Sequence, residues 1–160
     1  MKIVSLALLI TALMVSGCAD HKNTPEAGEI NAKASLPADF NFNKMGLKVI
    51  TSTVNTKSGT MATLYGNDSA KATAWTGNGK CRSTSIFALV TWKQQTDKRW
   101  IGGNIPGNLL SVEMLEANSD KQSTGIYSRF KDTGLTAYPD TSGQSARTKY
   151  ILSLKPSIMF

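Results

Sequence analysis

The residues best placed to act together chemically are two tryptophans and two carboxylates in the middle of the 160-residue chain. Trp92 and Trp100 flank a polar stretch that contains Asp97, and Glu113 follows on the next β-rich segment. Across a hairpin, the two indole rings would lie near each other and wall a pocket with a polar end. The pattern predicts a ligand-binding site at Trp92, Asp97, Trp100 and Glu113. The alternative, which is the commoner use of such residues, is core packing for the indoles and turn capping for Asp97.

A second candidate surface lies at residues 127–132. Tyr127, Arg129 and Lys131 alternate with other residues there, so a strand would place all three on one face. Such a polar and aromatic face could bind a ligand, and a solvated sheet edge is the alternative.

The other reactive groups do not form a known catalytic set. Cys81 lies between Lys80 and Arg82, which would lower the pKa of its thiol if they were close in space. A catalytic cysteine or serine also needs a histidine base, and the one histidine, His21, lies in a polar N-terminal stretch. Residues 77–81 lack the spacing of a P-loop. The sequence therefore assigns no catalytic residue and no metal site, and favours a protein that is not an enzyme.

The N-terminus has the pattern of an export signal. Lys2 precedes an apolar stretch at residues 3–15, shorter than the roughly 20 residues of a membrane-spanning helix. The stretch ends in Val15-Ser16-Gly17-Cys18, which resembles a bacterial lipobox, in which the thiol receives acyl chains and cleavage occurs before it. We predict a signal peptide at 1–17 and a lipidated Cys18 that holds the protein on a membrane of the bacterial envelope, facing the periplasm or the exterior. An ordinary signal peptide with a chance cysteine is the alternative.

Composition limits the classes of partner. The chain has 18 Lys and Arg against 11 Asp and Glu, a net charge of +7, and 41% hydrophobic residues. The basic residues are scattered and form no stripe of the kind that nucleic-acid binders use. A bland basic surface near an anionic membrane is the better interpretation.

The remaining pattern predicts one α+β domain at residues 40–160, an antiparallel β-sheet with a few short helices packed on it. Residues 18–39 are polar, lack an apolar period and predict a lipidated N-terminus followed by a flexible tether. The predicted strands are at 47–54, 60–66, 86–93, 99–105 and 110–116. A helix is expected at 70–75, loops at 94–98 and 118–124, and a turn at 105–108. Residues 125–130 are either a strand or a helical turn, 132–147 a long excursion, and 148–154 a strand or a helix.

Several short blocks carry a resemblance to a known family. They are Thr63-Leu64-Tyr65-Gly66-Asn67-Asp68, Leu89-Val90-Thr91-Trp92-Lys93-Gln94-Gln95-x-Asp97, Trp100-Ile101-Gly102-Gly103-x-Ile105-Pro106-Gly107, Ser111-Val112-Glu113, Lys149-Tyr150-Ile151 and Ser157-Ile158-Met159. Together they resemble the cytochrome P-460 family, and the resemblance covers roughly residues 45–160. The resemblance implies an antiparallel sheet with packed helices, often in a homodimer. It also implies haem c, a lysine–haem crosslink, and oxidation of hydroxylamine or binding of nitric oxide.

The chain departs from that family at the haem. It contains no Cys-x-x-Cys-His, which supplies the thiols and the axial imidazole for covalent haem c. The resemblance thus points to a haem-less branch, with no cofactor predicted and haem conceivable only without covalent attachment.

Three functions stay open at this stage. The first is a lipoprotein that binds a small ligand or a partner without catalysis. The second is a redox protein or gas sensor with non-covalent haem, and the third is a structural envelope protein that acts through its sheet edge.

Overall fold

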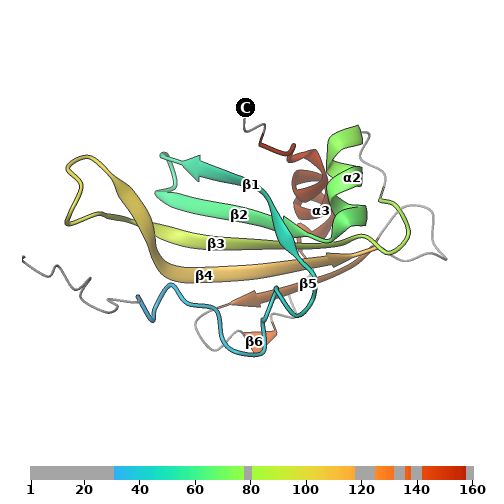
Figure 1. Cartoon of the computed structure of the whole chain (residues 1–160), viewed down its shortest axis with the longest axis horizontal. Coiled ribbons are helices and arrows are strands. Elements are labelled where there is room, and N and C mark those ends of the chain that lie inside the picture. The colour runs from blue at the N-terminus through green and yellow to red at the C-terminus, as the bar shows by residue number, and fades with distance from the viewer. Residues whose placement is uncertain (1–30, 78–80, 118–124, 132–135, 138–141, 158–160) are drawn as a thin grey trace, which may run out of the picture. The chain divides into compact units, whose positions relative to one another are not determined.

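The computed structural model of the chain describes residues 31–77, 81–117, 125–131, 136–137 and 142–157. The chain divides into Met1–Ile30 and a compact unit at Asn31–Phe160. Met1–Ile30, which contains the predicted signal peptide and Cys18, lies outside the described residues. The described elements of this unit are β1 (Lys48–Asn55), β2 (Thr60–Gly66), α2 (Asp68–Thr76), β3 (Ile86–Thr96), β4 (Asn104–Glu116), β5 (Ile126–Lys131), β6 (Thr136–Ala137) and α3 (Gln144–Ser153) (Figure 1). Neither described helix has the length and apolar character needed to cross a membrane.

The strands form one antiparallel sheet in the order β1-β2-β3-β4-β5-β6, so each strand pairs with its neighbour in sequence. The chain passes from β2 to β3 through helix α2, whereas β1 and β2 are joined by a short turn. The turn between β1 and β2 is closed by Asn55, whose side-chain oxygen accepts from the Ser58 amide, and by Gly59 at φ +61°. The predicted α+β class with an antiparallel sheet is confirmed.

Both faces of the central strands are buried. On β3, Phe87 and Leu89 point to one face, while Ala88, Val90 and Trp92 point to the other. The absence of alternation in residues 86–90 predicts this double burial, because a strand covered on both sides needs apolar residues at both parities.

Helices α2 and α3 cover one face, and Figure 1 shows them together at one end of the strands. Asn67 caps α2 by accepting from the Ala70 amide, and Gly77 ends the helix in the left-handed conformation. A Cβ at Gly66 would meet the Ala70 Cβ at 2.7 Å, so α2 packs directly on the end of β2. The helix-side core comprises Ile50, Leu64, Ala70, Ala74, Phe87, Leu89, Leu115 and Ile151.

The N-terminal segment at residues 31–47 covers the other face. Phe42 and Leu47 are buried there against the sheet, and Ala34, Leu36 and Phe40 pack around them. Phe40 also meets Phe130 of β5 edge to face, with ring centroids 5.1 Å apart. The predicted tether at 18–39 is therefore wrong for residues 31–39, and the folded unit starts at Asn31 instead of residue 40. The sequence did not indicate this packing, because the apolar residues of this segment are spaced too irregularly to form a periodic pattern.

The hairpin between β3 and β4 is longer than predicted. β3 continues to Thr96, a turn occupies 97–103, and β4 runs without a break from Asn104 to Glu116, so the predicted loop at 94–98, strand at 99–105 and turn at 105–108 are wrong. Pro106, which signals a turn in the sequence, lies opposite Gln94 where the register shifts. A proline without an amide proton is tolerated at such an irregularity.

The last elements resolve the open alternatives. Residues 126–131 form strand β5 rather than a helical turn, and the C-terminal segment is helix α3 rather than a strand. Helix α3 begins at Gln144, inside the predicted excursion at 132–147. The predicted loop at 118–124 lies outside the described residues.

The contact between Trp92 and the N-terminal segment gives a test of this layer. The Trp92 indole donates to the Ala34 carbonyl at 2.8 Å. We expect Trp92→Phe to lower the free energy of unfolding by about 1–2 kcal/mol, because the carbonyl loses its donor in a half-buried place. Urea denaturation followed by circular dichroism measures the change. Trp100→Phe is the matched control at an exposed site, and an equal loss in both variants would contradict the contact.

Candidate functional site

The four residues of the predicted aromatic pocket do not come together. Trp92 is buried against the N-terminal segment, whereas Glu113 has no exposed surface and lies on the helix-covered face. Trp100 is 74% exposed in the hairpin turn. Asp97 caps that turn by accepting from the Arg99 amide at 2.8 Å, which is the alternative use considered above.

The register explains the separation. Trp92 pairs with Leu109, and the ladder continues to Thr96 and Asn104 before the chain turns, so Trp100 lies beyond the paired strands. Trp92 and Glu113 have opposite parity in the same pair of strands and therefore point to opposite faces.

Glu113 instead organises a carboxylate cluster, which we define as Glu113, Tyr127, Arg129 and Arg147. The Arg147 guanidinium binds Glu113 with two nitrogens: Nε donates to Oε1 at 2.9 Å and Nη2 to Oε2 at 2.5 Å. The Tyr127 hydroxyl also donates to Oε1. This two-pronged contact fixes the plane of the guanidinium, as is typical of arginine–carboxylate pairs.

The ionisation of Glu113 follows from these contacts. Burial alone would raise its pKa, but the hydrogen bonds from Arg147 and Tyr127, with the charges of Arg147 and Arg129, lower the pKa below its usual 4.5. Burial and the hydrogen bond to Glu113 raise the pKa of Tyr127, and the hydrogen bond to Glu113 raises that of Arg147. At neutral pH the cluster therefore holds an ionised carboxylate, a neutral phenol and two guanidinium groups, a net charge of +1.

Tyr127 and Arg129 come from the second predicted surface. Arg129 pairs in register with Glu113, and its Nε is buried without a hydrogen-bond partner. Two of the three alternating residues thus face the cluster from a half-buried position instead of forming a solvated edge. The signal in the sequence was their period of two, but nothing in that pattern indicated Arg147 as a partner.

A polar cleft of about 260 Å³ lies beside Arg147, where the helices leave the sheet uncovered. Its floor is formed by helix-side positions of the first three strands, its wall by α3, and its rim by the β1–β2 turn. The lining residues are Thr53, Asn55, Ser58, Thr60, Ala62, Leu89, Thr91, Arg147 and Tyr150. The Tyr150 ring lies 4.8 Å from the Arg147 guanidinium carbon, so the guanidinium is held by Glu113 and faced by an aromatic ring.

A larger hollow of about 390 Å³ lies on the other face between the N-terminal segment and Tyr65. Its lining includes Phe40 and Phe42, and burial raises the pKa of the Tyr65 hydroxyl, which stays neutral. This hollow brings no charged side chain to a ligand, so we place the candidate site at the polar cleft.

The cleft supports binding better than catalysis. Glu113 is fully engaged by its partners, so it is a poor general base. Cys81 is half-buried against the helix-side core, and burial raises the pKa of its thiol, opposite to the direction predicted from its basic neighbours. The hydroxyls and the guanidinium can donate hydrogen bonds, which suits a small anionic ligand.

The cleft does not fit a haem group. The chain has no histidine among the described residues and no Cys-x-x-Cys-His anywhere. Apart from Tyr150, whose ring lies by the Arg147 guanidinium, the lining offers that guanidinium with hydroxyl, amide and apolar groups rather than iron ligands. Among the described residues, no group of three His, Cys, Asp or Glu side chains could hold a metal ion.

A scan with protein-family models finds no match to this chain, and no curated protein matches it. The resemblance to the cytochrome P-460 family therefore stays a prediction.

The carboxylate cluster predicts a pH dependence of stability. Because folding lowers the pKa of Glu113, the contribution of this carboxylate to the free energy of unfolding is complete above pH 4.5. That contribution is lost as the pH falls through the folded-state pKa. Tyr127 has a raised pKa, so its contribution is complete below pH 10 and is lost in more alkaline solution. Chemical denaturation between pH 3 and pH 7 measures the acid limb.

Glu113→Gln is the variant that isolates this limb. We expect Glu113→Gln to lower the free energy of unfolding by about 3 kcal/mol at pH 7. This value is at the lower end for a broken buried ion pair, because Arg147 keeps 36% of its side chain exposed. The difference from the wild type should shrink as the pH falls. Asp68→Asn, which removes the exposed ion pair with Lys48, is the control and should cost far less. A difference independent of pH would contradict the assignment.

Proposed function

We propose that the chain is an extracytoplasmic lipoprotein, anchored through an acylated Cys18, whose folded unit binds a small anionic ligand in the polar cleft without catalysis. The observation that carries the proposal is the Arg147 guanidinium, aligned by Glu113 at the wall of a cleft rimmed with hydroxyls.

The ligand class follows from the groups that line the cleft. Four hydroxyls from Thr53, Ser58, Thr60 and Thr91 can donate. The carboxylate cluster, Arg147 included, has a net charge of +1. A small carboxylate or phosphate of a few heavy atoms matches a volume of about 260 Å³ better than a large cofactor does. The half-buried Arg129, whose Nε is buried, is the second positive charge of this cluster and favours an anion near Arg147.

We also propose that the folded unit, Asn31–Phe160, is a cytochrome P-460-like domain of a haem-less branch. Support comes from the sequence blocks around Trp92 and Ile105-Pro106-Gly107 and from the antiparallel α+β architecture that the family resemblance implies. The missing haem attachment motif argues for binding rather than redox chemistry.

The anchor is tested by metabolic labelling with a radioactive fatty acid. We expect the wild type to carry label and Cys18→Ala to lose it, because the thiol is the acceptor for the acyl chains. Cys81→Ala is the matched control and should keep the label, since Cys81 is half-buried in the folded unit. An unlabelled wild type would contradict the lipoprotein proposal.

The cleft is tested by calorimetric titration with inorganic phosphate and with succinate. Ser58 and Thr60 hydroxyls lie 2.7 Å apart at the rim, and Thr60→Val keeps the shape while removing a donor. We expect the affinity to fall about 3- to 10-fold, the value of one hydrogen bond.

Thr63→Val provides the control. Its hydroxyl pairs with Ser52 at 2.9 Å between the same two strands, but on the opposite face of the sheet. It should leave the affinity unchanged. Equal effects of the two variants, or no binding of either anion, would contradict the proposed site, and stoichiometric binding of added haemin would favour the haem alternative.

A further inference from the structure

The turn of the β3–β4 hairpin presents two large apolar side chains to solvent. Trp100 is 74% exposed and Ile101 is completely exposed. The turn is closed by its own backbone, with the Asp97 amide donating to Gly103 at 2.9 Å and the Gly103 amide donating to Trp100 at 3.0 Å. Gly102 has φ +80°, which suits glycine. The hairpin tip, residues 97–103, is thus a formed turn with an apolar apex.

Basic residues adjoin this apex. The hairpin tip has two basic side chains, Lys98 and Arg99, against one acidic side chain, Asp97, a net charge of +1. Both basic residues are exposed. An interfacial tryptophan beside basic residues is the combination that favours the headgroup region of an anionic bilayer.

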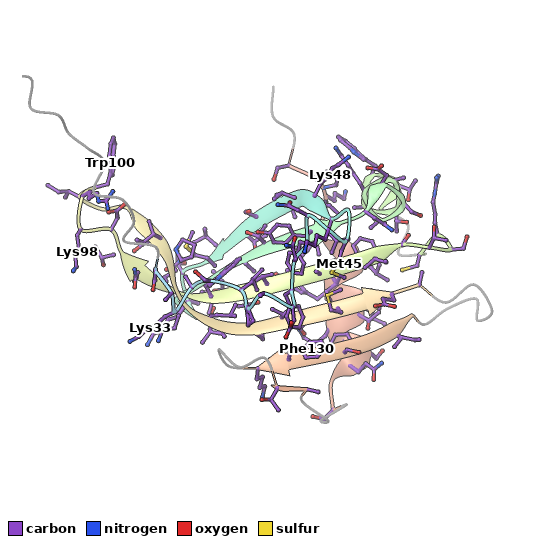
Figure 2. The ribbon with its side chains drawn as sticks, turned by 60° about the horizontal axis from the view of Figure 1, so that its bottom comes forward. Lys33, Met45, Lys48, Lys98, Trp100 and Phe130 are labelled. Carbon is purple, nitrogen blue, oxygen red and sulfur yellow. The ribbon has the colours of Figure 1, made fainter. Side chains whose placement is uncertain are left out.

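The N-terminal chain enters the folded unit at the same end. The Asn31 side-chain amide donates to the Pro106 carbonyl at 3.4 Å, and the Leu109 amide donates to Lys33 at 2.7 Å. Figure 2 shows Lys98 and Trp100 at the hairpin tip, with Lys33 nearer to that end than Lys48 or Phe130. A chain anchored at its N-terminus would therefore be connected to the membrane near the hairpin.

The lengths allow both contacts at once. The 13 residues from Cys18 to Asn31 span at most about 45 Å. The five residues from Pro106 to Ile101 span at most about 17 Å. An anchor at Cys18 can therefore reach the bilayer while the tip touches the same surface.

We propose that the hairpin tip inserts Trp100 and Ile101 into the interface of an anionic bilayer, as a second membrane contact that orients the folded unit. This inference rests on the proposed lipid anchor. A bilayer suits the tip better than a protein partner does, because two apical side chains cannot supply the roughly 1,200 Å² or more of a stable protein interface.

The test uses the full acylated chain on vesicles of phosphatidylglycerol and phosphatidylcholine whose acyl chains carry bromine, which quenches nearby tryptophan. The three tryptophans all lie in the folded unit, and Trp92 is buried. We expect brominated lipid to quench the wild type and Trp100→Phe to abolish the quenching. Trp75→Phe is the matched control, because Trp75 is 57% exposed on α2 at the other end of the sheet (Figure 1).

Two separate measurements test the basic residues of the tip and the lipid anchor. Replacing Lys98 and Arg99 together by Gln should weaken the quenching on vesicles that contain phosphatidylglycerol, and flotation of the vesicles reports the anchor. Flotation of the wild type without quenching, or quenching that survives Trp100→Phe, would overturn the tip contact and leave the anchor intact. Loss of flotation would overturn both proposals. Concentration-dependent shielding of Trp100 from acrylamide without vesicles would assign the tip to a second copy instead.

Discussion

A carboxylate without exposed surface must find its hydrogen bonds and its counter-charge inside the protein, and Glu113 is in that position. Its partners come from β5 and from α3, 14 and 34 residues further along the chain. Helix α3 packs on the sheet through the buried Thr148 and Ile151 and the partly buried Leu152. The bond from Arg147 to Glu113 adds a directional contact that helps to fix the rotation of the helix. That rotation places Arg147 and Tyr150 at the wall of the polar cleft. The site thus depends on an interaction that lies behind it.

The sheet can hold such a group because both of its faces are covered. Helices α2 and α3 shield one end of the first face, and residues 31–47 shield the second. The helices stop short of the row formed by Thr53, Ala62 and Thr91, which pair with one another across three strands. The change from Leu64 and Leu89 to small and hydroxyl-bearing residues along β2 and β3 marks the boundary between core and cleft.

The central strand β3 was predictable from the sequence, because Ile86 to Val90 are apolar at both parities. Helix α2 was predictable as well, because Asn67 and Gly77 are typical residues for the start and the end of a helix. The long β4 was not, because Pro106 and Gly107 resemble a turn in the sequence, while in the sheet they lie at a shifted register. Glu113 was identified as a candidate, yet with the wrong neighbours. Its parity sets it against Arg129 rather than Trp92, and no local pattern connects it to Arg147. Long-range pairs of this kind depend on how the elements pack, which sequence periodicity does not encode.

The proposed orientation also decides how the cleft meets its ligand. The β1–β2 turn that rims the cleft lies toward the hairpin end, since Thr60 pairs with Lys93 and the Gln94 amide donates to Gly59 at 2.8 Å. The strand residues from Lys93 to Thr96 extend about 10 Å, and the turn at 97–103 lies beyond them. An anionic bilayer repels small anions, but its field decays over about 8 Å at physiological ionic strength. A cleft held more than one such length from the headgroups meets a weakened repulsion, which the arginines of the cluster can offset. In the proposed orientation the hairpin serves as a spacer between the apolar tip and the polar cleft.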